Sequence, residues 1–228
     1  MKHSVVTVFV GVLFSSTVSS ALEIASSSFV GQTGDCVVAT EIQPDGSIIV
    51  AANISGGPLA PKSSPPGTVI RLLPDGSQVL AKISVGGRVN DMSIDDDGNI
   101  FVASTSGLVK LDKQTKGVVW RKDLGRVVNR VDAGRDGYCA VLCYDKPNED
   151  TATGAGTVSV FLPSGEQLGQ FKGKHFTIDL CLDSVSKTII CLGFRNARSW
   201  EGKRVFPVQI AYVKAHNYDG DEKYTLYD

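Results

Sequence analysis

One segment shape recurs four times along the chain: a short apolar strand, a tight turn and a second apolar strand. The first three copies turn at Asp-Gly pairs that begin at Asp45, Asp97 and Asp136, whereas the fourth, at 178–191, has no Asp-Gly. Asp-Gly supplies the positive φ that a tight hairpin requires. The pairs follow one another at intervals of roughly 40–50 residues, which is the spacing of a repeat architecture.

A second hairpin follows each of the first ones. Its strands are expected at 68–73 and 78–83, 107–111 and 118–123, 157–162 and 166–171, and 208–214 and 223–227. No long window keeps a helical apolar period without an interrupting Gly or Pro. Four strands in each unit of about 45 residues are typical of propeller blades.

We therefore predict an all-β fold, a β-propeller with about four four-stranded blades. The blades are expected at roughly 31–84, 85–124, 125–172 and 173–228. A two-sheet sandwich is the alternative, and the regular pairing of hairpins argues against it. Residues 22–30 could supply a strand to the last blade and close the ring. Equally, the chain stops where the fourth blade ends, as a fragment of a larger surface protein would.

The first 21 residues have the pattern of a secretory signal peptide. Lys2 and His3 precede an apolar run at 5–14, and Ser19-Ser20-Ala21 offers the small residues of a cleavage site. A membrane-spanning helix needs roughly 20 apolar residues, so this run is too short to be one. We expect cleavage after Ala21, a propeller domain at 22–228 without a transmembrane segment, and a secreted, periplasmic or cell-surface location. An uncleaved membrane anchor is the alternative.

Charge and cysteine content narrow the function classes. The 23 basic and 24 acidic residues give a net charge of −1, which argues against nucleic-acid binding, since that needs a basic face. The five cysteines are an odd number, so at least one thiol is free or pairs outside the chain, and any pairing stays open. Most of them are expected to be small buried apolar residues.

Two resemblances follow from the turn segments. Ile42–Ala51 and Val69–Ser77, with their Gln-Pro-Asp-Gly and Pro-Asp-Gly turns, resemble the delta-sixty-type tandem repeats of secreted bacterial β-propellers. This resemblance is good over the first two blades, loose in the third and poor in the fourth. It implies a fold and an extracellular or surface location, and it carries no catalytic residues. Leu111–Trp120 is similar to the tryptophan-docking repeat of quinoprotein propellers, where the Trp packs between blades, but it occurs once here.

The first strand of each propeller blade lines the central channel, and aligning these strands predicts a polar layer. Asp91, Arg130 and Asp179 fall in it, with Ala39 in the first blade, while Met92, Val131 and Leu180 should pack between blades. Two carboxylates could bind calcium, which needs six to eight oxygens, but a salt-bridged belt is favoured because the layer offers too few. The candidate ligand-binding residues at the channel and its entrance are Arg88, Asn90, Asp91, Asn129, Arg130, His175 and Asp179.

Long loops are expected on one face, at 55–66, 145–156 and 195–207. Such loops on a rigid scaffold commonly carry binding sites, although they can be mere insertions. The last holds four cations around Trp200. Its candidate contacts, Arg195, Arg198 and Trp200, could bind an anionic or sugar ligand by ion pairing and stacking, and a solvated loop is the alternative.

Catalytic motifs are few. Beyond the signal peptide only His175 and His216 remain, and no GxSxG, HExxH or phosphate-binding loop is present. The leading hypothesis is a non-enzymatic, secreted or cell-envelope scaffold that binds a protein or saccharide and needs no cofactor. The alternatives are a lactonase-like or other hydrolase propeller with a channel metal, and a fragment without activity of its own.

Overall fold

The computed structural model describes residues 36–54, 67–144, 156–173, 176–201 and 204–226, without the side chains of 195–201, 204–209 and 226. These residues form four antiparallel four-stranded sheets in which each strand pairs with its neighbours in sequence. The first two blades contain β1 Cys36–Ile42, β2 Ile48–Asn53, β3 Gly67–Leu72 and β4 Val79–Gly86, then β5 Val89–Ile94, β6 Ile100–Ser104, β7 Gly107–Leu111 and β8 Val118–Lys122. The last two contain β9 Val127–Ala133, β10 Cys139–Tyr144, β11 Thr157–Phe161 and β12 Gln167–Lys172, then β13 Phe176–Asp183, β14 Thr188–Glu201, β15 Arg204–Asn217 and β16 Glu222–Leu226.

The Asp-Gly hairpins fold as the sequence predicts. At the β5–β6 turn, Gly98 has a φ of 85° and its N–H donates to the carbonyl of Asp95 at 2.9 Å. The Asp95 carboxylate accepts the N–H of Asn99 at 2.8 Å, which fixes the turn from within. The fourth blade lacks the glycine, and Lys187 takes the positive φ of 51° in its place.

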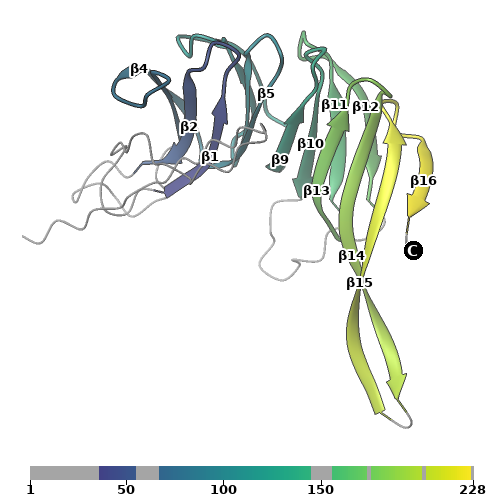
Figure 1. Ribbon diagram of the computed structural model, residues 1–228. Coiled ribbons are helices and arrows are strands. Elements are labelled where there is room, and N and C mark those ends of the chain that lie inside the picture. Colours follow the sequence, from purple (N-terminus) through teal and green to yellow (C-terminus); the bar gives the residue numbers. More distant parts are fainter. Residues whose placement is uncertain (1–35, 55–66, 145–155, 174–175, 202–203, 227–228) are drawn as a thin grey trace, which may run out of the picture.

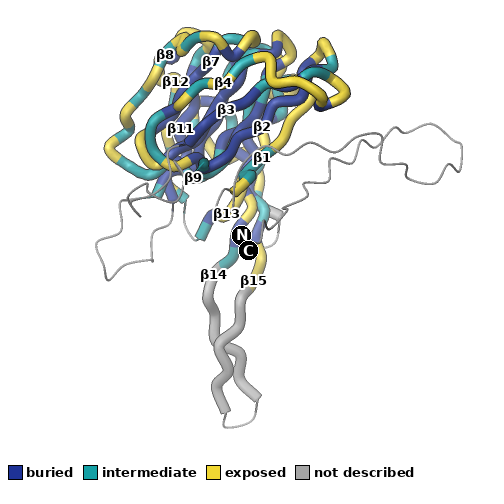
Figure 2. The backbone as a smooth tube through the Cα atoms, turned by 90° about the vertical axis from the view of Figure 1, so that its left-hand side faces the viewer, coloured by how far each residue is buried: buried dark blue, intermediate teal, exposed yellow. Residues whose placement is uncertain are grey.

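Three of the four apolar clusters lie between the sheets, and the fourth, Ile48, Val50, Ile70 and Leu72, lies on the first blade alone. Apolar side chains form one cluster between each pair of consecutive blades, and the middle strands are buried while the outer parts of the blades are exposed (Figure 2). Met92, Val131 and Leu180 have exposed fractions of 3%, 5% and 7% and belong to these three clusters in turn. Their predicted packing between blades is confirmed.

The four sheets stand side by side along an arc that is not closed into a ring (Figure 1). This confirms the predicted all-β propeller fold with four blades. The outer face of the fourth blade exposes apolar side chains, with Ile178 at 48% and Leu192 at 40%. In the interior of the arc, such positions are covered by the next blade.

The structure corrects the predicted loop at 195–207, because the segment continues as β-strand. β14 and β15 pair without interruption from Thr188↔Asn217 to Glu201↔Arg204. The other strands of the blade stop earlier: β13 pairs with β14 only as far as Phe194, and β16 pairs with β15 only from Val213 onward. The two-stranded part, Arg195–Glu201 with Arg204–Ile210, is called the arm, and it extends beyond the body of the blades (Figure 1).

The inter-blade core gives a stability prediction. Phe101 is fully buried between the second and third blades, with its ring 5.9 Å from that of Trp120 in an edge-to-face contact. Phe101→Ala should lower the free energy of unfolding by about 3–5 kcal/mol, as expected for a large buried side chain. The matched change Val119→Ala, at a side chain 54% exposed, should shift it by less than about 0.5 kcal/mol. Urea denaturation measures both, and equal losses would contradict the assigned core.

Candidate functional site

The innermost strand of every blade carries a β-bulge at the same place. The register shifts between Val37 and Ala39 in β1, and equivalent shifts occur in β5, β9 and β13. The residues that follow the four bulges are Ala39, Asp91, Arg130 and Asp179. The predicted layer therefore occupies equivalent positions on consecutive blades.

Arg130 lies between the two acids of this layer. Its Nε is 3.6 Å from the Asp179 carboxylate, and the side chains are 40% and 54% exposed. The Asp91 carboxylate accepts two backbone N–H groups, that of Met92 at 2.9 Å and that of Val131 in the next blade at 3.1 Å. Burial raises the pKa of Asp91, although these N–H groups and the Arg130 charge oppose it. The layer thus has the arrangement of an inter-blade belt.

A second layer, two residues further along each inner strand, was missed in the sequence. It contains Glu41, Ser93, Asp132 and Cys181. Asp132 accepts the N–H of Leu182 in the fourth blade at 2.7 Å and lies 3.1 Å from the Ser93 hydroxyl. Ser93 in turn accepts the N–H of Ala133 at 3.0 Å. The two-residue period of a strand is the signal that could have found this layer, because it repeats the first one on the same face.

The other predicted channel residues, Asn90, Asn129, Arg88 and His175, do not belong to either layer. The Asn90 amide donates to the carbonyl of Val128 at 2.8 Å, again across two blades, and the carbonyl of Asn129 accepts from Arg130 at 3.3 Å. Arg88 is exposed, and its backbone N–H donates to the Thr105 hydroxyl at 2.8 Å. His175 lies outside the described residues, so its place at the entrance stays a prediction.

Three acids of the inner strands have partners within the protein. The carboxylates of Asp91 and Asp132 are occupied by backbone N–H groups, and Asp179 by Arg130. In the described part of the chain, no group of three or more His, Cys, Asp or Glu side chains is placed to hold a metal ion. A calcium site at these strands, which would need six to eight oxygens, stays a prediction.

The cysteines are all free thiols. Cys139, Cys143 and Cys191 are buried, as predicted for most of the five, whereas Cys36 and Cys181 are exposed. Burial raises the pKa of Cys143 and of Cys191 to about 12. Because the thiolate is the reactive form, these two side chains are poor nucleophiles at neutral pH.

The three predicted loop contacts lie on strand β14, in the arm. Cross-strand register places Arg195 opposite Ile210, Arg198 opposite Pro207 and Trp200 opposite Val205. Their side chains are not among those described. The charged segment is therefore part of a regular ribbon rather than an irregular loop.

No protein-family model and no curated protein matches the chain. Solved structures do resemble its fold. Hydrazine synthase from Kuenenia stuttgartiensis is 11% identical with a TM-score of 0.61, over 88% of this chain and 51% of that one. The β-propeller domain of the Trilobed protease from Pyrococcus furiosus is 10% identical with a TM-score of 0.56, over 85% and 57%. BamB from Moraxella catarrhalis is 13% identical with a TM-score of 0.53, over 85% and 51%.

These likenesses establish the propeller fold alone. The chain spans between 51% and 57% of the length of the three structures.

Trp120 lies between two blades, since its indole N–H donates to the carbonyl of Pro163 in the third blade at 3.0 Å. Among the described residues, no helix is long and apolar enough to cross a membrane.

The hydrogen bonds between the inner strands of neighbouring blades can be tested through the stability of the protein. Asp132→Ala leaves the Leu182 N–H without its acceptor, so the free energy of unfolding should fall by about 1–3 kcal/mol. The control is Asp96→Ala, at a carboxylate that is 65% exposed and 3.9 Å from Arg135, which should have little effect. Thermal or urea unfolding compares the two. An unchanged stability of the Asp132 variant would mean that its inter-blade bond contributes nothing.

Proposed function

We propose that this protein is a non-enzymatic binding scaffold outside the cytoplasm, secreted or in the cell envelope, and that the arm carries its recognition surface. The carrying observation is the extension of β14 and β15 past the pairing limits of β13 and β16. Both edges of this ribbon lack a third strand in the described part of the blade. Unpaired strand edges and protruding ribbons are common sites of partner binding.

The composition of the arm supports an anionic partner. Arg195, Arg198, Lys203 and Arg204 are four cations within ten residues, with Glu201 as the one acid among them. The whole chain has a net charge of −1, so this positive charge is local. Guanidinium groups form paired hydrogen bonds with carboxylates and sulfates, and an aromatic ring such as that of Trp200 can stack on a sugar. An acidic saccharide is the partner class that this set favours.

The inner strands support a scaffold rather than a hydrolase. Asp91, Asp132 and Asp179 are used in contacts between blades, and burial raises the pKa of the buried thiols. The location outside the cytoplasm rests on the predicted signal peptide at 1–21 and on the resemblance to secreted propeller repeats. The arm and the inner strands thus have separate roles in this proposal, the first in recognition and the second in stability.

The charge of the arm is tested on a heparin resin, which serves as a polyanionic saccharide probe. Replacing Arg195, Arg198, Lys203 and Arg204 by Ser should make the protein elute at a clearly lower NaCl concentration. The control replaces four exposed cations of the first two blades, Lys82, Lys113, Lys116 and Arg121, and removes the same net charge. Equal shifts in both variants, or no retention of the unaltered protein, would contradict the proposal.

Shortening the arm separates recognition from folding. Asn196 and Gln209 are paired across the ribbon, so an Asn-Gly turn can join them in place of residues 197–208. Because the arm lies beyond the blade core, the melting temperature should change by no more than about 3 °C, while retention on heparin should fall. Differential scanning calorimetry and salt elution measure the two effects. A large loss of stability would assign the arm a structural role instead.

A further inference from the structure

A cavity of about 180 Å³ lies between the third and fourth blades. Phe171 lines it from β12 of the third blade. Thr177, Tyr212, Lys214, His216 and Glu222 line it from the fourth blade. An apolar ring thus faces a set of polar and charged side chains.

Lys214 supplies a buried positive charge with unused donors. Its side chain is only 6% exposed, and its Nζ lies 2.9 Å from a carboxylate oxygen of Glu222, a side chain that is 44% exposed. An ammonium group has three N–H donors, and Glu222 is its one acceptor among the described residues. Buried donors that remain unpaired are costly, so the cavity favours an oxygen acceptor at this point.

The charge of the cavity is positive. Glu222 is fully ionised at neutral pH, because hydrogen bonds from Thr225 and Lys214 lower its pKa to about 2. It therefore balances the charge of Lys214, and Lys172 at the rim adds one further positive charge. A ligand with a single negative charge would complete the balance.

His216 supplies a hydrogen-bond acceptor beside this donor. Its Nδ1 lies 3.1 Å from the carbonyl oxygen of Gly220, and since a carbonyl can only accept, Nδ1 carries the proton. Burial lowers the pKa of His216, which keeps the ring neutral at pH 7 and leaves Nε2 as an acceptor. The ring stacks on Phe171 with centroids 3.9 Å apart, which fixes its orientation.

We propose that this cavity binds a small hydroxycarboxylate, with the carboxylate on the Lys214 ammonium and a ligand hydroxyl donating to His216 Nε2. At about 180 Å³ the cavity is smaller than the roughly 300–1,000 Å³ of pockets for drug-sized ligands, so its ligand is a small molecule. Lactate and glycolate have this size and both functional groups. The hydroxyl pair of Thr177 and Tyr212, 2.7 Å apart, forms a further polar wall.

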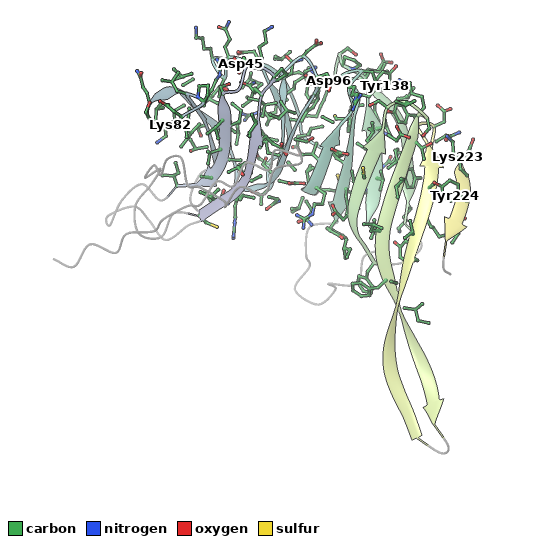
Figure 3. The ribbon with its side chains drawn as sticks, in the orientation of Figure 1. Asp45, Lys82, Asp96, Tyr138, Lys223 and Tyr224 are labelled. Atoms are coloured by element: carbon green, nitrogen blue, oxygen red, sulfur yellow. The ribbon has the colours of Figure 1, made fainter. Side chains whose placement is uncertain are left out.

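Calorimetric titration of the whole protein with lactate, and with acetate as the analogue without a hydroxyl, tests both contacts. Lys214→Met keeps the length of the side chain and removes its charge, so both ligands should bind at least tenfold more weakly. His216→Phe keeps the stacked ring and removes the acceptor, so lactate should fall to the affinity of acetate, which should itself be unchanged. Lys82→Met, on β4 of the first blade (Figure 3), is the control and should bind like the unaltered protein.

A second measurement does not depend on the variants' folding. In the unaltered protein, lactate should produce a saturable shift of the His216 ring Cε1–H resonance that acetate produces less strongly. The proposal is overturned if lactate gives no saturable shift, if acetate binds as tightly as lactate, or if Lys214→Met, folded by circular dichroism, binds both normally. None of these outcomes bears on heparin retention by the arm, so the two proposals fail separately.

Discussion

The fold depends on which groups hydrogen-bond to the unpaired backbone at the inner edge of each sheet. Strands β5, β9 and β13 each have a hydrogen-bonded neighbour on one side only, so half of their backbone groups face away from their own sheet. Asp91, Ser93 and Asp132 accept N–H groups of Val131, Ala133 and Leu182 in the following blade. An unpaired strand edge is both costly and prone to misassociation, and here the preceding blade covers it with side-chain oxygens. The apolar clusters bring the sheets together, and these bonds set the position of each against the next.

In this arrangement the inner strands hold the blades together, whereas the proposed recognition surface lies on the arm. A polar layer on the inner strands has the composition of a ligand site, yet its oxygens are engaged by neighbouring backbone and by Arg130. Asp45, Asp96 and Tyr138 lie along the upper side of the arc in Figure 3, at the first hairpin turns of the first three blades. The arm extends from the fourth blade on the opposite side (Figure 1). New contacts can therefore be made there without disturbing the belt.

Local sequence patterns predicted the parts of this fold that depend on local chemistry. The Asp-Gly turns and two-residue alternation located the hairpins, and aligning them placed Asp91, Arg130 and Asp179 at equivalent positions. The arm was wrongly predicted as a loop, because Gly202 and its neighbouring cations are typical of loops, whereas the strands are continued by cross-strand pairing. The cavity was not predicted, since Phe171 and His216 meet only when two blades pack, and no local pattern connects them.

The length of the arm has an electrostatic consequence. Seven residue pairs, from Arg195↔Ile210 to Glu201↔Arg204, continue past the last pairing of β13 with β14. At about 3.4 Å per residue, the ribbon reaches roughly 24 Å from the body of the blades. The Debye length at physiological ionic strength is about 8 Å, so the acidic groups of the body are screened from the tip. An approaching polyanion would therefore experience Arg198 and Arg204 largely independently of the near-neutral charge of the chain that carries them, whereas Arg195 lies at the base of the arm.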